Sequence, residues 1–430
     1  MFIYNLINMK KTLFICLALT LLSSCGYNKN INPDNYSLFD DKGMLKDSPL
    51  PDVNYKMGKI KCFIESSESM SGFFQANKST GFKSDVWSVL NEFYNKIDTV
   101  HLFRDASEPV AKMTLADFRK NMNSGNFRFA GSTHIPQMLK QVVQSLGKND
   151  VGIFISDMKY SPTGSQADVL LTQYGTDVKN AVQNAPYAFS IIGVTSSYIT
   201  RKGKIFDKSP YYIILIGNDL PLNKMKQKIV QCISKENLLG ELSFYRNEFK
   251  TPMYTLLANK GIVNGITYES NNNLYYTIGD INKESPVSFY LAADLSKLPQ
   301  HFLNDKTLLM QQLKVKAENA KATVEEVVDS ANFDFGNGSK EAAHKVHATH
   351  FIKIKVSDIL NGSTQVSVSV SRKEPDWLSS VCGAKYESEY DKTISFEQLQ
   401  AGLKRAYNAD KQSKYYYKDP FVILISEGKR

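Results

Sequence analysis

Strand-like and helix-like segments alternate from residue 57 to about residue 235, and this alternation constrains the fold more than any other feature. Short apolar runs at 59–64, 100–103 and 151–155 are separated by segments with helical spacing. The run at 151–155 is apolar throughout, which is typical of a strand buried on both faces of a parallel sheet. With further strands expected at 188–194 and 211–216, the pattern predicts a doubly wound, mostly parallel α/β sheet with right-handed crossovers.

The helices of this α/β region are predicted from apolar residues that recur every three or four positions. Ser84 is expected to cap one helix, and Pro136 lies in the first turn of another with a clean apolar stripe from Ile135 to Leu146. Two more are expected at 166–184 and 223–234. Because ligand sites in open α/β sheets lie beyond the carboxyl ends of the strands, the loops that follow the strands are the first place to look for chemistry.

The second half of the chain has a different pattern. After about residue 245 strand-like segments dominate, and the one at 364–371 alternates valine with polar residues. Ser395 and Gln398 form a capping box before a helix with one apolar face. We therefore expect an α/β domain at 57–245 and a mixed, mostly β domain at 246–430, with sandwich-like packing and inserted helices.

The N-terminus has the features of an export signal. Lys10 and Lys11 precede an apolar run at 12–22, which is followed by Ser23, Ser24 and Cys25. The run is far shorter than the roughly 20 residues that span a bilayer, and its charged start is typical of a secretory leader. A cysteine in this context resembles the lipobox of bacterial lipoproteins, which implies that Cys25 becomes the lipid-modified first residue. An ordinary signal peptide with an incidental cysteine is the alternative.

We therefore expect a signal peptide at 1–24, followed by a tether at 25–56. The tether is rich in Asn, Asp, Pro and Lys and has no apolar period. No acidic cluster follows Cys25, and such clusters resemble the surface-export signals of some lipoproteins. We therefore expect a lipid-anchored protein of the cell envelope that faces the periplasm from the outer membrane.

The net charge does not indicate a nucleic-acid partner. The chain has 52 Lys and Arg against 43 Asp and Glu, a surplus of +9 that is spread over its length. Residues 411–418 mix lysine with three tyrosines, as single-strand nucleic-acid sites do. In an exported protein a hairpin tip or a partner surface is the better interpretation, so we expect no nucleic acid.

Three polar loops follow strands or precede a helix in the α/β region and carry the predicted chemistry. The first is 65–72, with Glu65, Ser67 and Ser69; the second contains Thr133; the third is Ser156 with Asp157. If they converge at one edge of the sheet, their hydroxyls and carboxylates make an oxygen-rich site that suits Mg²⁺.

The order of these residues resembles the metal-ion-dependent adhesion site of von Willebrand factor A domains, Asp-x-Ser-x-Ser, then Thr, then Asp. Ser67 and Ser69 fall on the motif serines, Thr133 on the threonine and Asp157 on the later aspartate. Glu65 stands where the family has its first aspartate, which is a departure that moves the carboxylate outward by one methylene. The resemblance, which covers residues 57–235, implies a divalent cation and a protein partner whose carboxylate completes the site, and no catalysis.

Other interpretations of these loops stay open. Ser67, Ser69, Thr133 and Asp157 could cap helices or close turns in a metal-free scaffold. A hydrolase could use the same oxygen cluster, or His134 with Ser69 or Ser156, but no Gly-x-Ser-x-Gly elbow is present.

Cysteine and histidine patterns give weaker hypotheses. Cys62, Cys232 and Cys382 show no metal-binding spacing, and a disulfide between Cys232 and Cys382 is possible in the periplasm. Three histidines are spaced three residues apart and could hold a metal on one helix face: His344, His347 and His350.

Overall fold

The computed structural model describes residues 57–104, 110–160, 162, 166–247, 249–269, 273–336, 340–383, 390–409 and 412–428. The predicted signal peptide, lipid-modified Cys25 and tether lie outside these residues. Within them no helix is long and apolar enough to cross a membrane.

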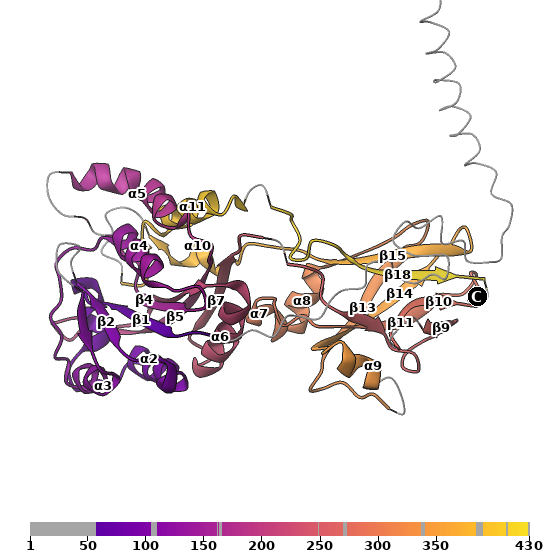
Figure 1. The fold of residues 1–430 in the computed structure, drawn as a ribbon, viewed down its shortest axis with the longest axis horizontal. Coiled ribbons are helices and arrows are strands. Elements are labelled where there is room, and N and C mark those ends of the chain that lie inside the picture. Colours follow the sequence, from indigo (N-terminus) through magenta and orange to yellow (C-terminus); the bar gives the residue numbers. More distant parts are fainter. Residues whose placement is uncertain are drawn as a thin grey trace, which may run out of the picture.

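The first half of the chain forms a seven-stranded sheet that is covered by helices on both faces (Figure 1). Its strand order is β3-β2-β1-β4-β6-β5-β7. The strands are β1 (Ile60–Glu65), β2 (Val100–Phe103), β3 (Ala111–Met113), β4 (Val151–Ser156), β5 (Ala188–Ile199), β6 (Ile205–Gly217) and β7 (Leu238–Phe244). The fold is therefore mixed α/β, as the alternation of strands and helices predicts.

The prediction of parallel pairing is correct at the centre of the sheet and wrong at its flanks. β2, β1 and β4 run parallel, whereas β3, β6, β5 and β7 pair antiparallel with their neighbours. β5 and β6 form a long hairpin without a crossover helix. The chain turns at Gly203, whose φ of +81° favours glycine. Its backbone N–H donates to the Thr200 carbonyl at 2.9 Å. Polar residues such as Ser196 and Ser209 interrupt the apolar runs, so the sequence shows only the cores of these two strands.

Helices cover each face of the sheet (Figure 1), and the sheet separates two apolar cores. One face packs against α2 (Gly81–Glu92), α3 (Leu115–Ser124) and α6 (Asp219–Cys232). The other packs against α4 (Ile135–Ser145), α5 (Ala167–Val182) and α11 (Phe396–Ala406). α2 begins three residues before the predicted Ser84 cap, since the Thr80 hydroxyl accepts from the Lys83 N–H at 3.3 Å.

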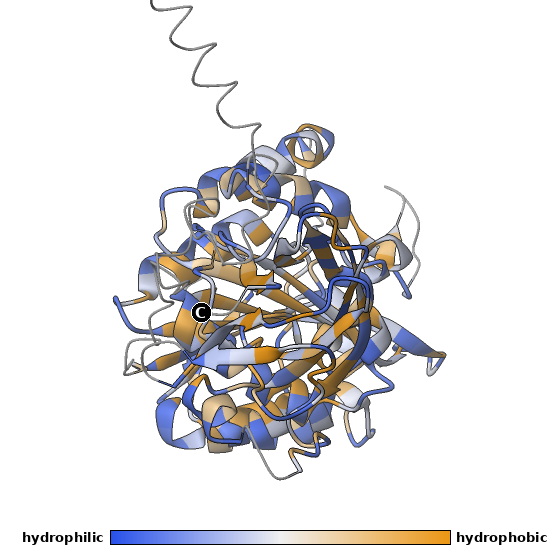
Figure 2. Cartoon of the chain, turned by 90° about the vertical axis from the view of Figure 1, so that its right-hand side faces the viewer, coloured by the Kyte–Doolittle hydropathy of each residue, from blue (hydrophilic) through white to orange (hydrophobic). Residues whose placement is uncertain are grey.

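The second half forms two sheets that share an apolar core, as expected for sandwich-like packing (Figure 2). The five-stranded sheet has the order β12-β15-β18-β10-β9: β12 (Leu313–Ala317), β15 (Ser363–Val370), β18 (Phe421–Ser426), β10 (Tyr275–Gly279) and β9 (Ile266–Glu269). The four-stranded sheet has the order β13-β14-β11-β8: β13 (Lys321–Asp329), β14 (His350–Ser357), β11 (Val287–Ala293) and β8 (Tyr254–Leu256). Short helices are α7 (Gln300–Leu303), α8 (Lys306–Gln312) and α9 (Lys340–Lys345).

Part of the second half returns to the first sheet. It contains α10 (Trp377–Val381), β16 (Cys382–Gly383), β17 (Thr393–Ile394) and α11. The rings of Phe396 and Tyr212 stack at 4.6 Å, and the Tyr407 hydroxyl donates to the Tyr187 carbonyl at 2.9 Å. The expected boundary at residue 245 therefore does not separate the chain into two independent halves.

Several weaker hypotheses from the sequence can be checked against side-chain positions. Tyr416 and Tyr417 are buried rather than displayed at a hairpin tip or surface. Cys62, Cys232 and Cys382 are all free thiols, so the possible disulfide is not formed.

Candidate functional site

The carboxyl ends of β1 and β4 bring two acidic residues to the same edge of the sheet. β1 ends at Glu65 and β4 at Ser156, and their parallel register pairs Ile64 with Ile155. Asp157 follows directly. Glu65 and Asp157 therefore emerge on neighbouring strands, and both are fully buried.

Backbone hydrogen bonds hold the loop before α4 against the loop after β1. The Glu68 N–H donates to the Ala130 carbonyl at 2.8 Å, and the Ala130 N–H donates to the Ser66 carbonyl at 2.9 Å. These bonds place Thr133, three residues further on, at the carboxyl end of β1. The three predicted loops thus meet at one place.

Glu65 lies at the centre of the cluster. Its Oε1 accepts from the Thr133 hydroxyl at 3.3 Å, and its Oε2 accepts from the Ser156 hydroxyl. The hydroxyls of Ser67 and Ser69 lie 2.9 Å apart. Burial, together with the nearby charge of Asp157, raises the pKa of Glu65 to about 8, although the surrounding hydroxyls oppose this rise.

Asp157 is only partly satisfied by its neighbours. Its Oδ1 accepts from the Lys159 N–H at 3.2 Å, but its Oδ2 is buried and has no hydrogen-bond partner among the described residues. Burial raises the pKa of Asp157, and the charge and backbone N–H of Lys159, together with a hydrogen bond from the Ser69 side chain, partly offset this effect. Two buried acidic side chains thus lie close enough to influence each other's ionisation, with little compensating positive charge.

Residues distant in the sequence close one side of the cluster. The Thr393 hydroxyl on β17 donates to the Asp157 carbonyl at 3.3 Å and lies 2.8 Å from the Tyr212 hydroxyl. On the other side Ser69 is half-buried, and Glu68 and Gly131 are exposed. The loops that contain Glu68 and Gly131 are therefore the part of the cluster's surroundings that meets solvent.

Sequence reasoning did not identify every residue that shapes the cluster. Ser156 was placed in the third loop, but its hydrogen bond to Glu65 was not predicted. Arg201 donates through Nη2 to both carboxylate oxygens of Glu68 at 2.7 Å, so the charge of Glu68 is engaged by the β5–β6 turn. No sequence pattern points to Arg201, Tyr212 or Thr393, because they lie far from the motif along the chain.

The donor set fits a hard divalent cation. Among the described residues, Asp157 Oδ2 is a buried carboxylate oxygen without a hydrogen-bond partner. The neighbouring carboxyl and hydroxyl groups offer oxygens of the kind that Mg²⁺ binds. In the segments that the structure describes, no group of three or more His, Cys, Asp or Glu side chains could hold a metal. A cation here would therefore depend on the hydroxyls of Ser67, Ser69 and Thr133 as well as on the two carboxylates.

The other candidate sites gain little from the structure. Ser156 is buried and its hydroxyl donates to Glu65, which leaves it poorly placed as a nucleophile. The three histidines do not share a helix face. His344 lies in the last turn of α9, whereas His350 is buried at the start of β14.

Comparison with known proteins gives no relative: no family model, no curated protein and no solved structure matches this chain.

The raised pKa of Glu65 predicts how the stability of the cation-free protein depends on pH. Native Glu65 keeps its proton up to about pH 8, whereas the unfolded residue loses it near its ordinary pKa of 4.5. Between these values the native state binds more protons, so stability falls as pH rises. We expect the melting temperature in chelator to drop by several degrees more from pH 6 to pH 8.5 in the wild type than in Glu65→Gln.

Glu68→Gln is the matched control for this measurement, because Glu68 is exposed at the rim of the same loop. It should keep the wild-type pH dependence. Equal pH dependence in the wild type and Glu65→Gln would contradict the assignment.

Proposed function

We propose that this chain is a cell-envelope lipoprotein that binds a protein partner at the carboxyl edge of its seven-stranded sheet. In this proposal lipid at Cys25 anchors it to the outer membrane on the periplasmic side. The sheet and its helices act as a von Willebrand factor A-like domain. The protein is a binding protein and not an enzyme, and neither nucleic acid nor catalysis is part of the proposal.

The observation that carries the proposal is Oδ2 of Asp157, which has no hydrogen-bond partner in the described part of the chain and lies buried near Glu65 and three hydroxyl-bearing residues. Burying like charges together is unfavourable unless a cation or a proton compensates them. A divalent cation held by Glu65, Ser67, Ser69, Thr133 and Asp157, with Mg²⁺ the first candidate, would supply the compensation. A carboxylate from the partner would complete the coordination of that cation.

A metal-free scaffold is the second candidate. The observation that favours it is the pKa of Glu65, raised to about 8, because a protonated Glu65 also relieves the repulsion. The two candidates differ in their response to cations: only the first predicts that Mg²⁺ stabilises the fold and promotes partner binding.

Gly131 allows partner access to be tested without disturbing the cluster. It is exposed, and a Cβ added to it would meet no atom within 4 Å. Gly131→Trp should therefore leave the melting temperature and its response to Mg²⁺ unchanged. We expect the bulky side chain at the open rim to abolish Mg²⁺-dependent capture of the partner from solubilised envelope.

Glu284→Trp, an exposed substitution in the β-rich half, is the control for nonspecific effects of a surface tryptophan. It should capture the partner as the wild type does, with Mg²⁺ and not with chelator. Undiminished capture by Gly131→Trp would place the partner surface elsewhere.

A further inference from the structure

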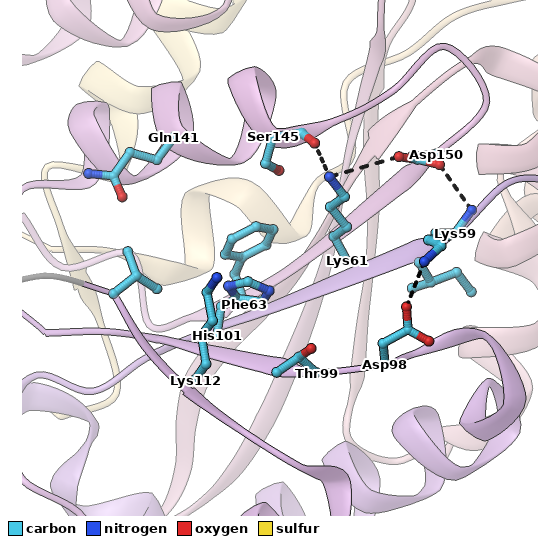
Figure 3. Close-up of a pocket in the computed structure, with 12 residues that line it drawn as sticks. Lys59, Lys61, Phe63, Asp98, Thr99, His101, Lys112, Gln141, Ser145 and Asp150 are labelled. Atoms are coloured by element: carbon cyan, nitrogen blue, oxygen red, sulfur yellow. Dashed lines mark hydrogen bonds and ion pairs between the residues drawn. The ribbon is translucent and has the colours of Figure 1, made fainter.

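A cavity lies on one face of the seven-stranded sheet, toward the amino end of β1. It has a volume of about 610 Å³, within the range of small-molecule sites. Its floor is formed by β1, β2 and β3, and α4 stands beside it (Figure 3). Along β1 the cavity extends from Lys59 to Phe63, so its nearest lining residue lies two residues, or about 7 Å, from Glu65 of the oxygen cluster.

Basic side chains line this cavity because of the strand register. Phe63 pairs with His101, and His101 pairs with Lys112, so the three residues lie in a row across the three strands on one face of the sheet. Lys61 lies on the same face of β1, two residues before Phe63. Figure 3 shows Lys112 and His101 side by side, with Gln141 and Ser145 on the neighbouring helix.

Two of the lysines at the cavity are already compensated. Lys59 Nζ lies 2.9 Å from Asp98, and Lys61 Nζ donates to the Ser145 carbonyl and lies 4.0 Å from Asp150. Lys112 has no acidic partner of this kind among the residues that line the cavity. The lining residues include three lysines and two aspartates, which leaves a surplus of one positive charge. This charge is that of Lys112, which lies beside His101.

The cavity also has surfaces for an uncharged, planar group. The centroids of the Phe63 and His101 rings lie 4.8 Å apart; Phe63 is buried beneath the half-buried His101, and Val110 adds apolar surface. Thr99 and Gln141 contribute hydroxyl and amide groups to the lining. An apolar surface with a few polar groups and one surplus charge suits a small monoanion with a planar body.

We infer that this cavity binds a small organic carboxylate, with the carboxylate beside Lys112 and the planar body against the half-buried His101 ring and Val110. The inference does not depend on the proposed cation site, which lies at the other end of β1. Burial and the charges of Lys112 and Lys61 lower the pKa of His101. A bound anion would oppose these effects and raise that pKa.

The test is an NMR titration of the His101 ring in the full chain with benzoate as the probe. Benzoate stays ionised between pH 5.5 and pH 8, so a change in affinity over this range reports on the protein. We expect saturable binding and a rise in the pKa of His101. Benzamide, which has the same shape without the charge, should not raise it.

Lys112→Ala should weaken benzoate binding about tenfold or more, as expected for the loss of a charged hydrogen bond. Lys208→Ala, which removes an exposed lysine of β6, is the matched control and should bind as the wild type does. Equal binding of benzamide and benzoate would overturn the inference, as would binding that is unaffected in Lys112→Ala. Absence of any benzoate-induced shift at His101 would overturn it as well. Retention of the wild-type spectrum elsewhere in the variant shows that it is folded.

Discussion

Lys226→Met is expected to destabilise the protein by about 3–5 kcal/mol, the cost of removing one partner from a buried ion pair. Lys226 on α6 and Glu241 on β7 are both about 1% exposed, and Lys226 Nζ lies 3.0 Å from Glu241 Oε2. Lys226 Nζ also donates to the Tyr245 hydroxyl at 3.3 Å. Burial lowers the pKa of Lys226, but Glu241 and Tyr245 more than offset this and raise it above its ordinary value.

The measurement is urea unfolding of the wild type, Lys226→Met and the double variant Lys226→Met with Glu241→Leu. Replacing both partners by apolar residues leaves no uncompensated buried charge, so the double variant should recover most of the lost stability. A loss below 1 kcal/mol in Lys226→Met would contradict this account of the pair. So would a double variant that is less stable than the single one.

Mg²⁺ at a hundred times its dissociation constant is expected to stabilise the wild type by about 2.7 kcal/mol. Asp157→Asn should abolish this gain, because it removes the carboxylate that has an unpartnered oxygen. In chelator the same variant should be at least as stable as the wild type, since it removes a buried carboxylate whose Oδ2 has no hydrogen-bond partner among the described residues. The stability order of the two proteins therefore reverses when Mg²⁺ is added.

The matched control is Glu68→Gln, which changes an exposed acid of the same loop and should keep the full response to Mg²⁺. The response is measured as the change in the free energy of unfolding with Mg²⁺, Mn²⁺ and Ca²⁺. If none of the three stabilises the wild type, the scaffold interpretation is favoured.

The centre of the fold and the core of the candidate site could be predicted from local patterns. The apolar run at 151–155 indicated a buried central strand, and β4 is buried along its whole length. Because polar residues follow β1 and β4 directly, the parallel register of these strands was enough to bring Glu65 and Asp157 together.

The rest depended on contacts between distant parts of the chain. Thr393 is 236 residues from Asp157, and Arg201 is 133 residues from Glu68. The sequence does not indicate the β5–β6 hairpin, because polar residues such as Ser196 and Ser209 interrupt the apolar pattern of its strands. These residues are nevertheless buried by tertiary packing. Residues 377–407 were assigned to the second half because a capping box predicts a helix at 395 but not the sheet that the helix covers.

The basic cavity shows a different limit of sequence reasoning. Lys61, His101 and Lys112 lie on three strands, and β3 is three residues long, too short to show a strand pattern. Only the pairing of β2 with β3 places Lys112 beside His101.

The most direct test of the cation proposal is a Mn²⁺ titration followed by electron paramagnetic resonance, in which free Mn²⁺ gives a strong signal. The account predicts one bound Mn²⁺ per wild-type chain, displaced by Mg²⁺, and none in Asp157→Asn, while Glu68→Gln binds as the wild type does. Binding of equal strength in the wild type and Asp157→Asn, or no binding to either, would contradict it.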